Sequence, residues 1–236
     1  MSDALHRLRA RYDLVRSELL LRQSPRVTLE LFHVRDINAL VDRMTPEDFG
    51  PDERLPYWAT AWPAATALAQ AILDAAPPKG PTLELGAGLG IASLVAARAG
   101  AEVVASDYEA DALLLLEANA EALGLPLARW LVDWRTARAD HAEASGRFAR
   151  VMGSDLVYEA RNVAPLADAI QHFLAPSGEV LIADPGRPYF PALLEALAAR
   201  QLQLEALPCP TGLLYRGSRD VYSRKVPGKD SDRSGA

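Results

Sequence analysis

The 236-residue sequence has little cysteine, histidine or lysine, and each scarcity argues against one kind of site. Its one cysteine, Cys209, leaves no partner for a disulfide within the chain. No lysine lies between Lys79 and Lys225, which disfavours the glycine–lysine phosphate loop of nucleotide hydrolases. The histidines are scattered and lack the spacing of metal ligands, so no metal is expected. They are His6, His33, His141 and His172.

The sequence also lacks basic runs and long apolar runs. The formal net charge is −6, whereas a nucleic-acid-binding protein is more often basic, so no nucleic-acid partner is expected. No run of eighteen apolar residues exists, and the start "MSDALHRLRARYD" has no signal-peptide core. We therefore expect a cytoplasmic protein that does not enter a membrane. Half of the residues are hydrophobic, which is enough for the core of one α/β domain.

The first fifty residues carry no recognisable motif. Their first apolar residues recur at steps of three and four and predict one amphipathic helix. These residues are Leu5, Leu8, Tyr12, Val15 and Leu19. Residues 26–32 are predicted to form a strand and residues 36–44 a short helix, followed by a loop over residues 45–56. We expect this segment to be a largely helical extension that packs on the core at the substrate side.

From Pro63 onward, helical and extended patterns alternate. Pro63 suits the first turn of a helix that runs to Ala76, and Thr60 is a candidate cap for it. Strands are predicted at residues 82–86, 101–107, 128–134, 147–155, 178–184, 202–207 and 212–226. Further helices are predicted at residues 90–100, 110–124, 161–174 and 189–200. This alternation predicts an α/β fold, a mostly parallel sheet with helices on both faces.

Ligands of such sheets bind at the carboxyl ends of the strands. The positions to consider are Gly86–Gly90, Asp107, Asp133–Trp134, Ser154–Asp155 and Asp184. The loop "GAGLG" does not fit the dinucleotide pattern G-x-G-x-x-G, because Ile91 stands where its last glycine should be. S-adenosylmethionine has no phosphate and remains a candidate. It needs glycines for close backbone approach, a carboxylate for its ribose and a polar and aromatic wall for adenine.

Asp107 is placed to bind the ribose, and Asp133 and Trp134 to form the adenine wall. Each feature alone has a structural alternative: a turn without ligand, a helix-capping aspartate or a core tryptophan. Their succession at consecutive strand ends favours the cofactor site.

These segments together resemble the seven-β-strand methyltransferases, and among them the protein lysine methyltransferase-like family. The resemblance rests on "WATAWP", "LELGAGLG", "ASD", "LVDW" and "SDLVY" and covers about residues 55–184. The segment "PYWATAWPAA" looks closest to the enzymes that methylate the β subunit of electron-transfer flavoprotein. The resemblance implies a Rossmann-like, seven-stranded domain over residues 51–224. Residues 1–50 would then be the N-terminal extension, and residues 225–236 are expected to be a disordered tail.

The resemblance also implies roles for individual residues. Gly86 and Gly88 would approach the methionine part of the cofactor, with Ser154 at the edge of the same pocket. Asp107 would hold the ribose hydroxyls, and Asp133 would face the adenine amino group. The remaining residues of the implied cofactor site are Trp62, Glu84, Ala87, Tyr108 and Trp134.

Asp155 and Tyr158 would face the substrate amine, with Asp155 binding and orienting it. The structural alternative is that Asp155 caps the following turn and Tyr158 packs in the core.

Three functions stay open at this stage. The first is transfer of a methyl group from S-adenosylmethionine to a lysine of a protein, by a monomeric enzyme. The second is methylation of a small molecule at nitrogen or oxygen on the same fold, since the fold does not decide the substrate. The third is a non-enzymatic binding protein. The prolines of the N-P-P-Y motif, which adenine and glutamine methyltransferases carry, are missing at residues 154–158.

Overall fold

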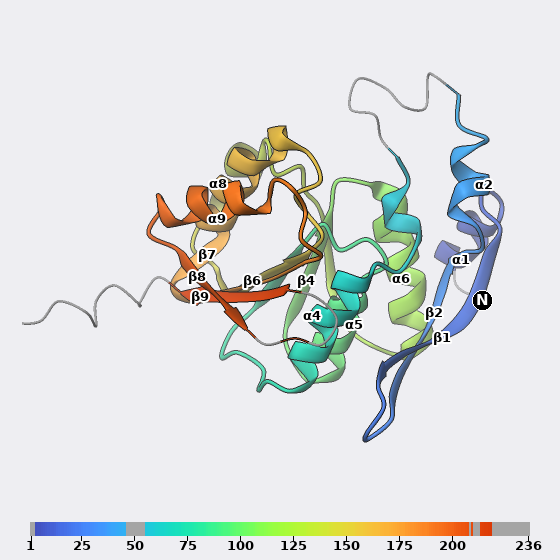
Figure 1. The fold of residues 1–236 in the computed structure, drawn as a ribbon. Coiled ribbons are helices and arrows are strands. Elements are labelled where there is room, and N and C mark those ends of the chain that lie inside the picture. Colours follow the sequence, from blue (N-terminus) through green and yellow to red (C-terminus); the bar gives the residue numbers. More distant parts are fainter. Residues whose placement is uncertain (1–2, 46–54, 208, 210–212, 219–236) are drawn as a thin grey trace, which may run out of the picture.

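A twisted sheet of seven strands forms the centre of the protein (Figure 1). The computed structural model describes residues 3–45, 55–207, 209 and 213–218. The strands lie in the order β5-β4-β3-β6-β7-β9-β8; β3 to β7 run parallel, and β9 is antiparallel to both of its neighbours. Their bounds are β3 (Thr82–Leu85), β4 (Val103–Asp107), β5 (Ala128–Leu131), β6 (Phe148–Ser154), β7 (Leu174–Asp184), β8 (Gln203–Leu207) and β9 (Leu213–Ser218). The mostly parallel α/β sheet predicted from the sequence is confirmed.

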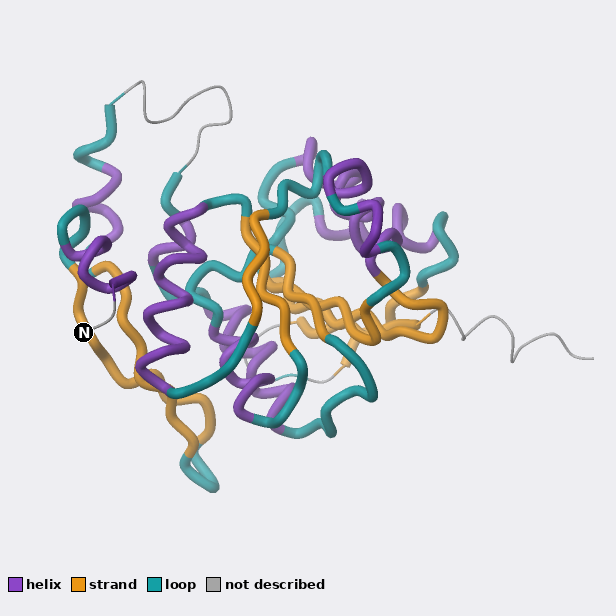
Figure 2. The backbone as a smooth tube through the Cα atoms, turned by 180° about the vertical axis from the view of Figure 1, so that it is seen from behind, coloured by secondary structure: helices purple, strands orange, loops and turns teal. Residues whose placement is uncertain are grey.

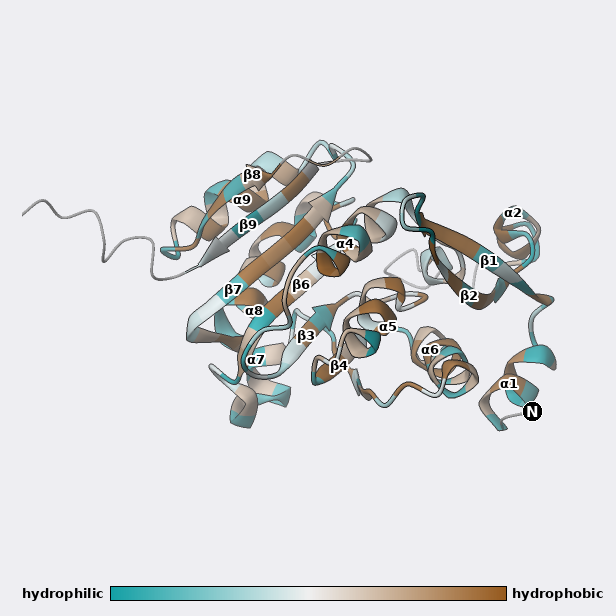
Figure 3. Ribbon diagram, turned by 90° about the horizontal axis from the view of Figure 1, so that it is seen from below, coloured by the Kyte–Doolittle hydropathy of each residue, from teal (hydrophilic) through white to brown (hydrophobic). Residues whose placement is uncertain are grey.

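Helices cover both faces of the sheet, and two separate apolar clusters fill the space beneath them (Figure 3). One face carries α4 (Pro63–Leu73), α5 (Ile91–Arg98) and α6 (Ala110–Leu123). The other carries α7 (Ala137–Asp140), α8 (Val163–Phe173) and α9 (Phe190–Ala198). Short 3-10 turns occur at η1 (Tyr57–Ala59), η2 (Ala142–Ala144) and η3 (Ala160–Asn162).

Central strands such as β4 and β7 carry apolar side chains on both sides because each side meets one of these clusters. In β4, Val103 and Ala105 face the α4–α6 cluster, whereas Val104 between them faces the α7–α9 cluster. In β7, Leu181 and Ile182 divide in the same way. Side chains alternate along a strand, so a strand buried on both faces has no polar side.

The N-terminal residues form a separate small unit at the side of the sheet (Figure 2). It consists of α1 (Asp3–Arg9), the antiparallel hairpin β1 (Leu14–Arg22) and β2 (Val27–Val34), and α2 (Ile37–Val41). The hairpin is fastened to α6 by a buried side chain, since the Asn119 amide accepts from Phe32 N at 2.7 Å and donates to Phe32 O at 3.1 Å.

The predicted amphipathic helix at the start of the chain is wrong beyond Arg9. The structure ends α1 there and places Val15 and Leu19 in β1, opposite His33 and Leu29 of β2. Pairing with β2, the other strand of the same hairpin, satisfies the backbone of this segment. Strand pairing therefore overrides a short helical spacing of apolar residues.

Other details differ from the predictions as well: α2 spans Ile37–Val41 and not residues 36–44, and α4 ends at Leu73 and not at Ala76. Trp62 precedes α4 with no side-chain cap, so Thr60 does not cap this helix. Strand β5 ends at Leu131, and residues 133–134 lie in the loop beyond it. Strand β7 begins at Leu174 and contains Pro176. Its pairing with β6 passes from Leu174 to Glu179 with a shift of register, so Pro176 lies in an irregular stretch where its missing N–H is tolerated.

Some predictions fall outside the residues that the structure describes. The tail of residues 225–236 and the loop over residues 46–54 belong to them. Within the described residues, no helix is both long enough and apolar enough to cross a membrane.

Candidate functional site

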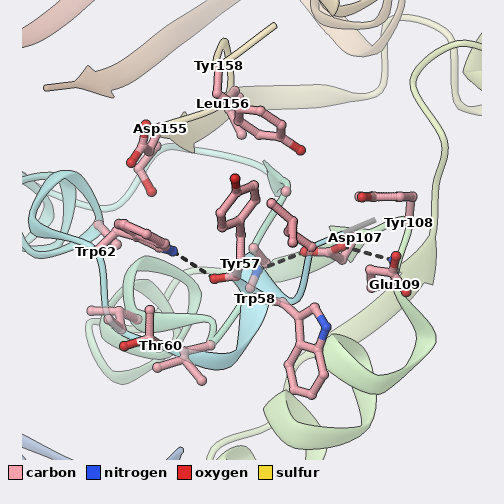
Figure 4. A pocket seen from close by; sticks show the side chains of 18 of the residues that line it. Tyr57, Trp58, Thr60, Trp62, Asp107, Tyr108, Glu109, Asp155, Leu156 and Tyr158 are labelled. Carbon is pink, nitrogen blue, oxygen red and sulfur yellow. Dashed lines mark hydrogen bonds between the residues drawn. The ribbon is translucent and has the colours of Figure 1, made fainter. Parts of the chain in front are cut away.

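A cavity of about 200 Å³ opens at the carboxyl ends of β3, β4 and β6 (Figure 4). This is the sheet edge at which ligands of parallel α/β folds bind. Its walls come from η1 and the start of α4, from the glycine loop after β3 and from the segments after β4 to β7. The sequence-predicted residues that line it are Trp62, Gly86, Ala87, Gly88, Asp107, Tyr108, Trp134, Ser154, Asp155 and Tyr158. Two predicted cofactor residues, Glu84 and Asp133, lie elsewhere.

The floor of the cavity is the glycine loop, which three left-handed glycines shape. Gly86, Gly88 and Gly90 have φ angles of 61°, 52° and 74°, a region that other residues rarely adopt. A Cβ on Gly86 would lie 2.7 Å from Cδ2 of Leu156. A Cβ on Gly88 would lie 3.5 Å from Cα of Trp58. The loop thus brings bare backbone to the cavity.

Asp107 joins the end of β4 to this loop. Its carboxylate accepts a hydrogen bond from Gly88 N at 2.9 Å and another from Glu109 N at 3.0 Å. Only 6% of the residue is exposed, and burial raises the pKa of its carboxyl while the backbone donors oppose that rise. The two donors fix the carboxylate at the cavity wall, so its direction is set before any ligand binds.

Glu84 lies beneath the loop in the core and does not line the cavity. Its carboxylate accepts from Ser93 N at 2.9 Å and from the Ser93 hydroxyl. The role of this side chain in the structure is therefore to hold the first turn of α5 against β3. Burial raises the pKa of Glu84 to about 7, although the bonds from Ser93 lower it.

This buried acid is expected to make stability depend on pH. Between the ordinary pKa of 4.5 and about 7, the folded protein keeps a proton that the unfolded chain releases. The free energy of unfolding then falls as pH rises through this range, by up to about 3 kcal/mol for this group. We expect Glu84→Gln to remove this contribution. Urea denaturation of both proteins from pH 4.5 to 8 measures it, and parallel curves would contradict the assignment.

Aromatic rings form one wall of the cavity. The Trp62 indole Nε1–H donates to Tyr57 O at 2.7 Å. The Tyr57 ring meets the Trp62 and Tyr158 rings edge to face, with centroids 5.8 and 5.3 Å apart. Burial and the neighbouring Tyr108 raise the pKa of Tyr158 well above its ordinary value, so its hydroxyl stays protonated. In Figure 4 the Tyr57 ring points toward Asp155 and Tyr158.

Asp155 is paired with a cation that the sequence analysis missed. Nε of Arg187 donates to Oδ1 of Asp155 at 2.6 Å, and Nη2 donates to Oδ2 at 2.9 Å. The Asp155 side chain is 7% exposed and that of Arg187 is 35% exposed. Asp155 has a φ of 55°, a left-handed conformation that aspartate tolerates better than most residues.

Arg187 reaches this position through the turn after β7. Oδ1 of Asp184 accepts from Gly186 N at 2.8 Å and from Arg187 N at 2.7 Å. Asp184 is one of the strand-end residues at which the sequence predicts a ligand site. The arginine three positions later had no motif of its own, and only the fold brings it to Asp155.

Asp133 lies beside the main cavity rather than in it. Its carboxylate pairs with Arg135, with Nη2 of the arginine 2.6 Å from Oδ2. It lines a smaller adjoining cavity together with Tyr108, Trp134 and Tyr158, which also line the main one. These three side chains therefore lie between the two spaces. Among the residues that the structure describes, no cluster of possible metal ligands occurs.

The sequence of this region matches a known family. Residues 58–189 match the family model described as lysine methyltransferase. The chain belongs to this lysine methyltransferase family. The matched range begins at Trp58 of η1 and ends just beyond Arg187, so it contains every residue of the cavity wall except Leu55 and Tyr57.

Curated relatives of this family member agree with that assignment. The electron transfer flavoprotein beta subunit lysine methyltransferase of Mus musculus is 30% identical over 168 residues, which are 66% of this chain and 61% of the relative. The enzyme of the same name from Xenopus laevis is 32% identical over 142 residues, 57% of this chain and 54% of the relative. The match thus spans between 54% and 61% of the length of these relatives.

Solved structures confirm the fold of this family member. A 16S rRNA N2 G1207 methyltransferase of T. Thermophilus, in complex with AdoMet and guanosine, superposes with a TM-score of 0.61 at 19% identity. The match covers 87% of this chain and 50% of that one. A ribosomal protein L11 methylase of Lactobacillus delbrueckii subsp. bulgaricus gives a TM-score of 0.53 at 24% identity, over 68% and 80% of the two chains. The seven-stranded Rossmann-like methyltransferase fold is confirmed.

Proposed function

We propose that this protein binds S-adenosylmethionine in the cavity and transfers its methyl group to a lysine side chain of another protein. The observation that carries the proposal is the cavity itself, which joins the glycine loop, Asp107 and the Asp155–Tyr158 segment at one sheet edge. Family membership and the lysine methyltransferases among the relatives support it.

The cofactor half of the site is the side formed by β3 and β4. Here the backbone of Gly86 and Gly88 is open to a ligand, and Asp107 presents a fixed carboxylate for the ribose hydroxyls. Trp62, Ala87, Tyr108 and Ser154 would complete the contacts, with Trp134 as the wall toward adenine. The adjoining cavity that Asp133 lines is the space in which the adenine amino group would meet that carboxylate.

The acceptor half is the side formed by Asp155, Tyr158 and Tyr57. Transfer requires a neutral amine, whereas a lysine with a pKa of ~10.4 is neutral in about one molecule in 2,500 at pH 7. The methyl donor is already activated, so the protein chiefly aligns the two reactants and excludes water. Asp155 would orient the incoming amine, and the aromatic rings would line its path and keep water out.

Two measurements test this function. Calorimetry with S-adenosylmethionine is expected to give saturable binding with one site per chain, and no measurable affinity would refute any methyltransferase assignment. Tritiated-methyl transfer in a lysate of the source organism is expected to label a protein band. Label confined to small molecules would favour the alternative, a small-molecule N- or O-methyltransferase. Monomeric state and cytoplasmic location stay predictions, and sedimentation of the purified protein tests the first.

Asp107→Ala is expected to weaken S-adenosylmethionine binding by about tenfold to a hundredfold, because hydrogen bonds to a charged group contribute roughly 1.5–3 kcal/mol. The substitution also frees Gly88 N and Glu109 N from their acceptor. Calorimetry measures the affinity. Asp140→Ala, at the end of the remote helix α7, is the control and should bind as the unmodified protein does. Equal affinities of all three proteins would remove Asp107 from the cofactor site.

A further inference from the structure

Arg187 is the one cationic side chain among the described residues that line the cavity. Three acids line the same cavity, namely Asp107, Glu109 and Asp155. The guanidinium makes a two-pronged contact with Asp155, and its side chain is still 35% exposed. It therefore occupies a position from which its charge acts both on Asp155 and on whatever enters beside it.

The arginine is held in this position from two sides. The turn at Asp184 fixes its backbone N–H, and the bonds to Asp155 fix its head and raise the pKa of the guanidinium. Such two-pronged contacts have a defined geometry that a lysine ammonium does not reproduce. The ion pair is thus a built part of the acceptor side of the cavity.

We propose that Arg187 is a positioning residue that neutralises Asp155 and so favours the neutral, reactive form of the acceptor lysine. This inference rests on the proposed function. An unpaired Asp155 would attract the lysine ammonium and raise the pKa of the amine, which opposes transfer. The guanidinium cancels that charge, so Asp155 can accept a hydrogen bond from the amine without holding its proton in place.

Several other ionisable groups face this space or adjoin Arg187. Asp107 from β4 accepts two backbone bonds, and Glu109 lies at the start of α6. Tyr57, Tyr108 and Tyr158 are phenols, and the raised pKa of Tyr158 keeps it neutral. Asp184 accepts from the backbone of Arg187; burial raises the pKa of its carboxyl, whereas the hydrogen bond from the Arg187 backbone and the charge of Arg187 lower it.

The step itself is balanced without a further reactant. The lysine ammonium first releases a proton to water. The lone pair of the neutral amine then forms a bond to the methyl carbon of the sulfonium, and the carbon–sulfur bond breaks with its electrons going to sulfur. The products are a thioether and a methylated ammonium, so each transfer releases one proton in all, the one lost to water before the bond forms.

The pH dependence of kcat tests the inference, because it reports groups of the enzyme–substrate complex. The unmodified protein should show a rising limb that marks deprotonation of the bound amine. In Arg187→Gln we expect this limb to move to higher pH by about one unit, the lower end of the effect of a neighbouring charge. Its kcat would then be about tenfold lower at pH 7 and would recover at high pH.

Three matched variants separate charge from structure. Arg187→Lys keeps the charge and should keep the limb in place. The double variant Asp155→Asn with Arg187→Gln removes both charges, and its residual activity should show a limb displaced back toward that of the unmodified protein. Arg200→Gln removes the arginine of another aspartate pair, with Asp168 on α8, and should leave the limb unchanged.

Several outcomes would overturn the inference. In the first, Arg187→Gln lowers kcat equally at every pH, which indicates a structural role. In the second, it weakens cofactor binding more than tenfold with an unmoved limb, which indicates contact with the cofactor carboxylate instead. If Arg187→Gln does not fold, the kcat profile of Arg187→Lys decides. A rising limb at higher pH than in the unmodified protein would then overturn the inference, because this variant keeps the charge. Absence of lysine methylation by the unmodified protein would refute the proposed function itself and, with it, the inference.

Discussion

Gly90→Ala is expected to lower the free energy of unfolding by about 3 kcal/mol, the sum of left-handed strain and overpacking. The φ of Gly90 is 74°, and a Cβ there would lie 1.9 Å from Cδ1 of Leu116. Leu116 is fully buried on α6, so it has no free space into which to move. Urea denaturation at constant pH measures the loss.

Gly124→Ala is the matched control. Gly124 ends α6 with a φ of 64°, close to that of Gly90, but a Cβ there would meet nothing within 4 Å. Its replacement should therefore cost only the strain, about 1 kcal/mol. The difference between the two variants measures the contact with Leu116. Equal losses would mean that α6 and the glycine loop separate readily.

Asp155→Asn is expected to lower kcat by about a hundredfold or more, the effect of losing the alignment of a reacting group. Affinity for S-adenosylmethionine should stay within a few-fold. Asparagine tolerates the φ of 55° and has the same shape, but it carries no charge and accepts at only one oxygen. It can therefore neither hold Arg187 by two prongs nor orient the amine in the same way. Single-turnover methyl transfer and calorimetry measure the two effects.

Asp168→Asn provides the comparison, because Asp168 of α8 pairs with Arg200, just after α9, and neither residue lines the cavity. Its turnover should be close to that of the unmodified protein. Turnover of Asp155→Asn at the same level would remove Asp155 from the acceptor site and would favour its structural reading as a residue of the turn after β6.

The central fold could be predicted because local sequence and tertiary structure agree there. Gly124 caps α6 in the left-handed conformation, and Pro63 begins α4, as their residue types indicate. The N-terminal unit could not be predicted in the same way. Its hairpin depends on pairing between β1 and β2, although the apolar residues of β1 continue a helical spacing, and on hydrogen bonds between Asn119 and Phe32, which are distant in sequence.

The same distinction applies to the candidate site. Gly86 directly follows β3 and Asp107 ends β4, and their place at the cavity could be predicted from these positions at strand ends. Glu84 points from the middle of β3 into the core, and Asp133 turns to its neighbour Arg135. Arg187 required knowledge of the turn after β7. Which of these residues contact the cofactor or the acceptor stays a prediction until the variants are measured.

The contact between Tyr12 and Trp58 gives the hairpin side of the molecule a part in shaping the cavity. The two rings meet edge to face with centroids 5.3 Å apart, and the backbone of Trp58 lies against Gly88. The Tyr12 hydroxyl also donates to Asp111, at the first turn of α6. A chain shortened to begin at residue 51 would expose Trp58 and leave the Asn119 amide without its backbone partner. The N-terminal unit is therefore part of the packing that holds Trp58 against the glycine loop, and a foreign N-terminal segment could replace it only by supplying a ring for Trp58 and a backbone partner for Asn119.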